Sequence, residues 1–173
     1  MSDGEPQGAR KIRSYEYAVA GLDHRAALSM SGLDYMRALV AGELGARPSI
    51  SDTIGMSLPR EIEYGRVVFE AQAADFLLNP LGVIHGGFAA TLLDSAMGCA
   101  VHTALPAATG YTTAELKINY TRAMTPETGL LRAEGAVIHV GRRMATAEGR
   151  LLGEDGKLYA HGSTTCFVFP LKG

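Results

Sequence analysis

The feature that most constrains the fold is one apolar segment, residues 86–104, which begins at a pair of glycines and ends shortly before Pro106. Apolar side chains would occupy nearly every face of the helix that this segment forms. A helix of that kind is surrounded by protein on all sides. The segment is about as long as a membrane span, but Asp94 and His102 interrupt it. We therefore expect a buried helix of a soluble protein rather than a membrane anchor.

Beyond Pro106 the apolar residues recur with a period of two, which is typical of strands. Asp155-Gly156 is a hairpin-turn signature between the last two strands. One buried helix followed by an antiparallel meander predicts an α+β fold. The predicted strands are residues 111–121, 130–140, 144–153 and 158–169.

The residues before the central helix divide into a predicted flexible tail, 1–28, and an amphipathic flap helix within 29–48. In the tail, packing is expected only at Ile12, Tyr15, Tyr17 and Val19. The helix should start at a capping box on Ser31 and Asp34.

The flap helix should stop at Gly45 and Pro48. The main domain, 49–173, then opens with two predicted strands, 54–58 and 61–73, around a turn near Gly65.

Composition narrows the function classes. The chain has 173 residues, 47% of them hydrophobic, which suits a single globular domain. Its net charge of −2 gives no support for nucleic-acid binding. Cys99 and Cys166 are interpreted as small buried hydrophobic residues, and no cluster has metal-ligand spacing. No apolar leader precedes residue 25, so we expect a cytoplasmic protein.

The start of the central helix predicts an anion site. Unpaired backbone N–H groups at Gly86 and Gly87 carry partial positive charge, and glycine lets a ligand approach the backbone closely. Asp94, set among leucine, alanine and methionine, is a carboxylate that is costly to bury without a function. One oxyanion site and one carboxylate are the minimum for hydrolysing an ester or thioester.

The chain resembles the hotdog-fold acyl-CoA thioesterases of the phenylacetate-pathway (PaaI-like) family over roughly residues 45–170. The likeness continues through residues 110–122. The residues that carry it are Asn79, Gly82, His85-Gly86-Gly87, Leu92, Asp94, Ala96 and Gly98. The resemblance implies a sheet wrapped around one central helix, hydrolysis of an acyl-CoA, and no cofactor beyond the coenzyme A of the substrate.

Spacing adds an expectation about assembly. Asp94 lies eight residues beyond Gly86, or ~12 Å along a helix, too far for one carbonyl carbon to touch both. The carboxylate should therefore act on a carbonyl held by a second subunit, which predicts a homodimer, possibly paired into a tetramer.

Within such a site, Asp94 is the predicted nucleophile or general base, and Gly86 N–H the oxyanion donor. His85 either hydrogen-bonds the thioester or orients the loop. Asn79 either holds water or the carbonyl, or is a turn residue before Pro80. The resemblance implies that Thr113 stands near the attacking water, although threonine is equally typical of an ordinary strand.

Substrate binding is expected at Gly87, at Thr112 and at three arginines that suit phosphate, Arg122, Arg142 and Arg143. These arginines sit at strand ends, where loops could gather on one edge; solvated surface arginine is the alternative. The predicted acyl-pocket residues, which could equally be core, are Met36, Leu39, Val40, Phe76, Leu77 and Met97.

Two other functions stay open. A hotdog dehydratase or hydratase would move a proton at carbon and commonly uses a histidine with an acidic partner. A non-catalytic acyl-CoA-binding module would bind without turnover. The order of His85, two glycines and Asp94 favours the thioesterase.

Overall fold

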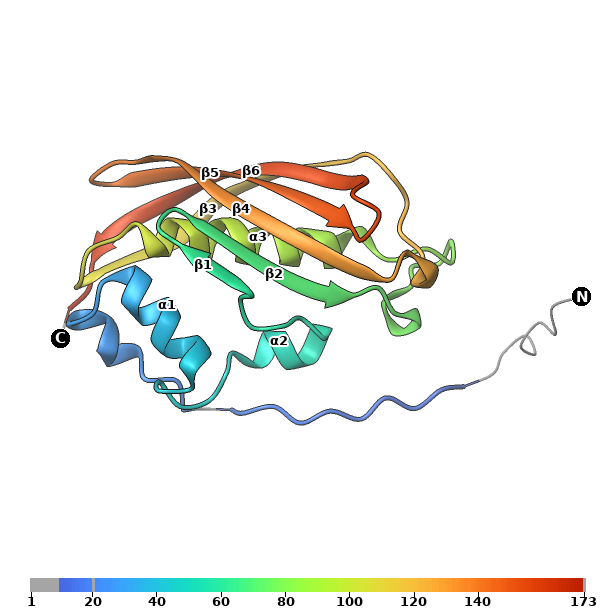
Figure 1. Ribbon diagram of the computed structural model, residues 1–173, viewed down its shortest axis with the longest axis horizontal. Coiled ribbons are helices and arrows are strands. Elements are labelled where there is room, and N and C mark those ends of the chain that lie inside the picture. Colours follow the sequence, from blue (N-terminus) through green and yellow to red (C-terminus); the bar gives the residue numbers. More distant parts are fainter. Residues whose placement is uncertain (1–9, 20, 173) are drawn as a thin grey trace, which may run out of the picture.

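A computed structural model describes residues 10–19 and 21–172 of the chain. In it, one antiparallel sheet curves around a long helix, α3 (Gly86–Thr103), as Figure 1 shows. This confirms the predicted α+β hotdog architecture. The spatial order of the strands is β1-β2-β4-β5-β6-β3, which leaves β1 and β3 at the edges. The strands are β1 (Glu61–Glu63), β2 (Arg66–Gln72), β3 (Thr109–Tyr120), β4 (Leu130–Val140), β5 (Met144–Gly153) and β6 (Leu158–Pro170).

The period-two pattern located the second half of the sheet accurately. β4 and β5 have the predicted bounds, and β3 and β6 differ from them by one or two residues. On β5 the side chains of Ala145, Ala147 and Leu151 are fully buried, while their neighbours turn to the outer face. Alternate residues of a strand point to opposite faces, so one face packs on α3 and the other meets water.

Helix α3 is the centre of the core. Leu92, Leu93 and Met97 are fully buried, and each contributes about 1.5–3 kcal/mol through burial. The helix contacts every strand of the sheet. The apolar segment is therefore a buried helix of the domain, as its all-round pattern predicts.

A row of glycines lets the sheet approach this helix closely. Gly135 on β4 pairs with Gly149 on β5, which pairs with Gly162 on β6. A Cβ atom at Gly135 would lie 2.3 Å from the backbone of Ala96, and one at Gly149 would lie 2.9 Å from Met97. Side chains at these positions would push the sheet off α3, so the row fixes where the helix lies.

Helix α1 (Gly32–Ala41) begins as predicted and ends earlier. Ser31 Oγ accepts a hydrogen bond from Asp34 N at 3.2 Å, which confirms the cap on Ser31. The helix ends at Gly42, whose φ of 78° lies in the left-handed region. The predicted end at Gly45 and Pro48 is wrong because Gly42 already provides the left-handed cap that terminates a helix.

The predicted strand at residues 54–58 is also wrong. A short helix, α2 (Ser49–Ile54), ends where that strand was predicted to begin, and Met56 forms only an isolated bridge with Ala71. Pro48 in an extended conformation starts the helix and Gly55, with φ 74°, ends it. The predicted strand 61–73 is two strands, β1 and β2, with Gly65 between them.

The N-terminal segment lies along α2 (Figure 1). Arg13 donates to the backbone oxygens of Asp52 and Thr53, at 3.0 and 2.8 Å, and Lys11 pairs with Asp75 at 2.8 Å. Residues 1–9 and 20 of the predicted tail lie outside the described residues. The expectation that apolar packing orders this segment is wrong, because Ile12, Tyr15, Tyr17 and Val19 are all exposed. The short 3-10 helices of the chain are His24–Leu28, Asp75–Leu77 and Pro126–Thr128.

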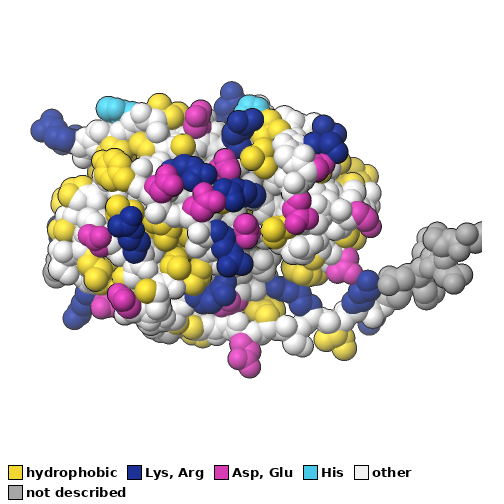
Figure 2. All heavy atoms as spheres, in the orientation of Figure 1, with side chains coloured by type: hydrophobic (Ala, Val, Ile, Leu, Met, Phe, Trp, Pro, Cys, Tyr) yellow, Lys and Arg dark blue, Asp and Glu magenta, His cyan; other side chains and the backbone are white. Residues whose placement is uncertain are grey.

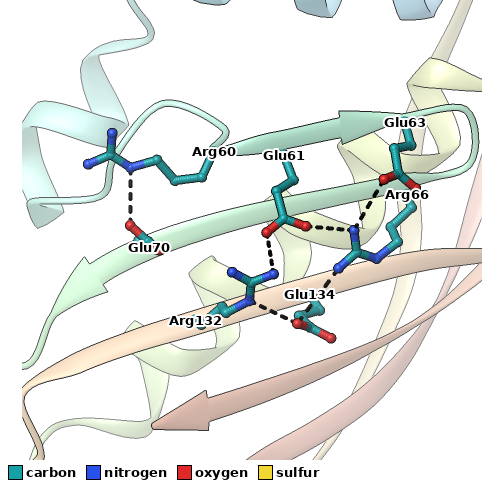
Figure 3. A network of polar contacts seen from close by, with 7 residues as sticks. All are labelled: Arg60, Glu61, Glu63, Arg66, Glu70, Arg132 and Glu134. Atoms are coloured by element: carbon teal, nitrogen blue, oxygen red, sulfur yellow. Dashed lines mark hydrogen bonds and ion pairs between the residues drawn. The ribbon is translucent and has the colours of Figure 1, made fainter. Parts of the chain in front are cut away.

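Ion pairs gather on the outer face of the sheet. Basic and acidic side chains intermingle in the middle of the face seen in Figure 2. Figure 3 shows Glu61 between Arg66 and Arg132, with Glu134 on the far side of both arginines. Hydrogen bonds from Arg66 and Arg132 lower the pKa of the Glu61 carboxyl. These carboxylates are neutralised by partners, which marks a surface network rather than a reactive site.

Candidate functional site

Asp94 lies in the middle of α3 on the side that faces β3. Its carboxylate is half-buried, and Thr113 Oγ1 of β3 donates a hydrogen bond to its Oδ1 at 2.9 Å. The structure thus brings two of the predicted site residues into direct contact. A hydrogen bond from a hydroxyl fixes the carboxylate and leaves its other oxygen available for a substrate or a water.

Asp94 borders a cavity of about 240 Å³. Thr113 and Ser95 stand beside it, and most of the remaining wall is apolar. The other residues around the cavity are Met36, Leu39, Pro48, Ile50, Ser51, Met56, Leu58, Pro59, Phe69, Gly98, Cys99 and Tyr111. A mainly apolar cavity with a few polar groups at one end is the form of most small-molecule sites.

Helices α1 and α2 form one side of this cavity, and we call them the cover. Met36 and Leu39 of α1 line the cavity as predicted. Among the other predicted pocket residues, Val40 is 42% exposed, and Phe76 and Leu77 lie outside the cavity wall. Met97 belongs to the core between α3 and the sheet. Helix α2 supplies two wall residues, Ile50 and Ser51, which were missed because no helix was predicted there.

The cavity wall also contains a thiol, Cys99 of α3. Burial raises the pKa of the Cys99 thiol to about 12. The thiol therefore stays protonated near neutral pH and is a poor nucleophile. Cys166 is buried and free as well. Cys166 is a small buried group, as predicted, whereas Cys99 is partly buried and faces the cavity. Asp94 is the charged side chain that borders the cavity.

A second centre lies at the start of α3. His85 Nδ1 accepts a hydrogen bond from Gly87 N at 2.8 Å, so His85 caps the helix. Among the described residues, Gly86 N–H has no hydrogen-bond partner. The cap thus uses the Gly87 donor and leaves the Gly86 donor free at the positive end of the helix.

Tyr120 is a residue of this centre to which the sequence analysis gave no role. Its hydroxyl donates to Gly86 O at 3.1 Å, and its ring would lie 3.2 Å from a Cβ atom at position 86. Tyr120 therefore holds the first turn of α3 against the end of β3. Its place within the resembling segment 110–122 was the signal that could have identified it.

Asn79 shapes the loop before the helix. Its side-chain oxygen accepts from Leu81 N at 2.8 Å and from Val83 N at 3.3 Å. The loop then leads through Ile84, whose N–H donates to Met124 O at 2.8 Å, to His85. In this structure the Asn79 oxygen serves the turn that delivers His85 and Gly86.

The two centres are separate within one chain. Gly86 and Asp94 are ~12 Å apart along α3. The cavity that Asp94 borders contains neither His85 nor Gly86. One subunit therefore presents two half-sites, one with the carboxylate and one with the free N–H donor.

The predicted phosphate-binding arginines do not gather within one subunit. Arg122 N donates to Tyr159 O at the start of β6, whereas Arg143 O accepts from Val168 N near its end. Those two partners are nine positions apart, which corresponds to ~30 Å of strand. Arg142 and Arg143 line a surface groove together with Met144 and residues 167–170.

Thr112 is separated from the Asp94 site by its position on β3. It precedes Thr113, whose hydroxyl faces Asp94, and successive strand residues point to opposite faces. Thr112 therefore lies on the other face of the sheet, where it pairs with Phe167.

Metal ligation and membrane insertion find no support in the described residues. In the described stretch of the chain, His, Cys, Asp and Glu side chains do not form a group of three that could hold a metal ion. Across residues 10–19 and 21–172, every helix is too short or too polar to cross a membrane.

Comparison with protein families finds a match to the thioesterase superfamily over residues 81–160. The matched region runs from the loop before His85 into β6. It therefore contains both half-sites and the two elements, α3 and β3, that position them.

Solved structures agree in fold over most of the chain. A conserved protein of Pseudomonas aeruginosa is 32% identical, with a TM-score of 0.65, over 70% of this chain and 94% of that one. A "putative thioesterase, phenylacetic acid degradation-related protein" of Ralstonia eutropha is 28% identical, with a TM-score of 0.69. That alignment covers 77% of this chain and 98% of the other.

A curated relative is similar over a shorter region. The "putative esterase" of Halobacterium salinarum is 44% identical over 69 residues, which are 39% of this chain. The chain spans less than half the length of that relative, 44% of it.

Proposed function

We propose that the chain, which matches the thioesterase superfamily over residues 81–160, is a thioester hydrolase that cleaves an acyl-CoA to a carboxylic acid and free coenzyme A. The observation that carries the proposal is the Asp94 carboxylate, held by Thr113 at the edge of an apolar cavity. The cavity takes the acyl group, and the carboxylate stands where the acyl group meets the thioester. The similarity to the phenylacetic acid degradation-related protein supports a PaaI-like substrate group.

In the proposed reaction, an oxygen bonds to the thioester carbon and the carbon–sulfur bond breaks. Asp94 either attacks that carbon itself, giving an anhydride that water then opens, or takes a proton from the attacking water. The electron pair of the broken bond leaves with sulfur, which is protonated to the free thiol. No metal or redox cofactor takes part in these steps.

Negative charge develops on the carbonyl oxygen, and Gly86 N–H is the proposed donor that stabilises it. The donor is free among the described residues because His85 binds Gly87 N–H instead. In this proposal His85 and Asn79 act on the loop, and Tyr120 holds Gly86 in place. Gly87 has no side chain and therefore leaves room for the thioester beside the backbone.

The separation of the half-sites supports a homodimer. β3 lies at the edge of the sheet, so its outer backbone groups are free to pair with another strand. Thr113 marks the Asp94 half-site and Tyr120 marks the Gly86 half-site, and both face α3. Two β3 strands can pair in antiparallel fashion about a two-fold axis near Lys117. Because the bulge after Thr113 adds one unpaired residue, this register places Thr113 opposite Tyr120 of the partner subunit.

The same axis gives the arginines a common location. In this register, Arg122 of the partner subunit would lie beside residues 110–112, at the start of β3. Arg142 and Arg143 lie at that end of the sheet, three strand spacings or ~14 Å away. Coenzyme A phosphates bridging these arginines across the dimer are the proposed use of all three.

The first test measures thiol release from phenylacetyl-, benzoyl-, hexanoyl- and palmitoyl-CoA. We expect wild type to act on the shorter acyl groups and Asp94→Asn to lose at least a hundredfold in kcat. Asp94→Asn is nearly isosteric, so a folded but silent variant assigns the carboxylate. Activity of Asp94→Asn within tenfold of wild type would contradict the proposal. Formation of an enoyl-CoA without free thiol would instead favour the dehydratase.

A second test removes only the oxyanion donor. Gly86 is the first residue of α3, where proline is well tolerated, and His85 has the extended conformation that precedes proline. Gly86→Pro deletes the N–H, and we expect kcat to fall by about 10²–10³. Gly86→Ala is the matched control, since it adds a Cβ beside Tyr120 but keeps the donor. Equal losses in the two variants would remove Gly86 N–H from the mechanism.

A third test addresses the shared site. Dimers made by co-expressing Asp94→Asn with Gly86→Pro contain mixed pairs in which one of the two sites is intact. Random mixing should restore about a quarter of wild-type activity if the half-sites come from different subunits. Lys117→Cys should also cross-link two subunits on mild oxidation, whereas Lys157→Cys in the distant hairpin should not. No recovery on mixing would place both half-sites in one subunit.

A further inference from the structure

Tyr111 of β3 borders the same cavity as Asp94, and the proposed mechanism gives it no part. Its ring lies close against α3 at Gly98. A Cβ atom at Gly98 would lie 3.1 Å from the Cε2 atom of the tyrosine and 3.2 Å from its hydroxyl oxygen. The missing side chain at Gly98 therefore leaves room for the ring and places the hydroxyl at the surface of the helix.

Two periodicities place this hydroxyl near the Asp94 carboxylate. Gly98 follows Asp94 by four residues, so the two positions share one face of α3, with about 5–6 Å between their Cβ positions. Tyr111 and Thr113 are alternate residues of β3, so both side chains point toward the helix. Thr113 binds one oxygen of the carboxylate at 2.9 Å, and Tyr111 stands one helical turn further along.

The hydroxyl of Tyr111 stays protonated, and its oxygen can accept a hydrogen bond. Burial raises the pKa of this hydroxyl well above its usual value, and the nearby Cys99, Cys166 and Asp94 raise it further. The O–H group is the hydrogen-bond partner of the Cys99 sulfur, to which it donates. A hydroxyl oxygen has two acceptor lone pairs besides its one donor, so the lone pairs of Tyr111 remain for a group in the cavity.

A water that attacks a thioester has to be held by both of its protons. One proton passes to the base, and the second needs an acceptor so that a lone pair points at the carbonyl carbon. Two oxygens that share one water lie at most ~5.5 Å apart, because each O–H···O bond is about 2.7–2.8 Å long. One helical turn between Asp94 and the hydroxyl of Tyr111 matches that separation.

We propose that Tyr111 is a catalytic residue that orients the attacking water by accepting a hydrogen bond from the proton that Asp94 does not take. The inference rests on the proposed acyl-CoA thioesterase function, and it makes Asp94 a general base rather than a nucleophile. The water oxygen bonds to the thioester carbon while one of its protons passes to Asp94. The carbon–sulfur bond then breaks, sulfur leaves with the electron pair, and the proton on Asp94 passes to sulfur. Tyr111 keeps its own proton throughout.

The first measurement compares thiol release from phenylacetyl-CoA and hexanoyl-CoA by wild type and Tyr111→Phe. The variant removes the hydroxyl and keeps the ring against Gly98 and beside His102. We expect kcat to fall about tenfold or more with KM within about twofold, because the lost contact is to the water and not to the acyl group. Tyr35→Phe is the matched control, since it removes a hydroxyl from the other tyrosine that packs on His102 and should leave kcat unchanged.

Competition between water and methanol separates orientation of the water from a packing role. Methanol has a single O–H, which it gives to Asp94, so its attack to form a methyl ester does not use the Tyr111 oxygen. In buffer that contains methanol, the ratio of methyl ester to free acid should therefore rise several-fold in Tyr111→Phe. Phenylalanine and tyrosine are nearly equal in size, so the variant gains little room for the methyl group.

Two outcomes overturn the inference. One is a kcat of Tyr111→Phe within about threefold of wild type. The other is a fall in kcat with an unchanged ratio of products, including no methyl ester from either protein, which would give Tyr111 a purely structural role. Failure of the proposed function is distinguishable, because wild type would then release no thiol from any acyl-CoA, and the inference would fall with it.

Discussion

The body of the molecule, which is the sheet and α3, contrasts with the cover formed by α1 and α2. In the body most of the helix is buried, and Gly135 lets the backbone of the sheet approach that of the helix. In the cover, the helices have 10 and 6 residues, and much of their surface faces water or the cavity. The body thus fixes Asp94 and Gly86, whereas the cover decides what the cavity accepts. Changes in the body should unfold the protein, and changes in the cover should alter its selectivity first.

The largest effect is expected from Gly135→Ala in the body. The added Cβ would lie 2.3 Å from the carbonyl of Ala96, and neither backbone can move without displacing a strand or α3. We expect the free energy of unfolding to fall by about 3 kcal/mol or more, measured by urea denaturation. Glu134→Ala, on the same strand but in the surface ion-pair network, should cost about 1 kcal/mol or less. Similar losses for the two variants would contradict close packing of the sheet on α3.

Gly32→Ala makes the corresponding change in the cover. A Cβ at Gly32 would lie 1.7 Å from the carbonyl oxygen of His102, so α1 must move away from α3. We expect the body to stay folded, with near-native circular dichroism, while thiol release from short acyl-CoA falls about tenfold or more. A cooperative loss of the whole fold would show that cover and body are a single unit.

The sequence predicted the body more accurately than the cover. In the body, the period of two and the all-round apolar helix report burial directly, so β4, β5 and α3 were located within a residue or two. In the cover, single residues decide the outcome: Gly42 and Gly55 end two helices, and Pro48 starts one. A six-residue helix has too few turns for periodicity to distinguish it from a strand.

The candidate site divides in the same way. Asp94 and Thr113 could be identified because their residue types and positions carry the chemistry, and the structure joins them. Tyr120 could not, because its role arises from a contact with Gly86, 34 residues away in the sequence. The sequence also could not show that Arg122 and Arg143 lie at opposite ends of β6, because their positions depend on how the strands pair.

A smaller effect is expected from the segment that ties the cover in place. Arg13 donates to two carbonyl oxygens of α2 and its guanidinium lies 3.9 Å from the ring centre of Phe76. Arg13→Ala should cost about 1 kcal/mol and should speed amide hydrogen exchange in α2 without changing exchange in α3. Arg10→Ala removes a nearby exposed arginine and serves as the control. Unchanged exchange in α2 would mean that the segment does not hold the cover.

The smallest effect concerns pH and the contact between the two regions. His102 of α3 packs between Tyr35 of α1 and Tyr111 of β3, with ring centres 5.2 and 5.5 Å away. Burial lowers the pKa of the His102 imidazole in the folded protein. In the unfolded chain, histidine binds a proton below about pH 6.5. As pH falls through that value, the unfolded state therefore takes up protons that the folded state does not, and the free energy of unfolding decreases.

Replacing His102 with phenylalanine keeps an aromatic ring between the two tyrosines and removes the titrating group. The free energy of unfolding of His102→Phe should therefore change less than that of wild type between pH 7.5 and 5.5, measured by urea denaturation at each pH. His161→Gln, an exposed position on β6, is the control and should follow wild type. The window stops at pH 5.5 because carboxylates such as that of Glu61 titrate below it. Parallel curves for His102→Phe and wild type would show that closure of the cover on α3 places no penalty on the charged form of His102.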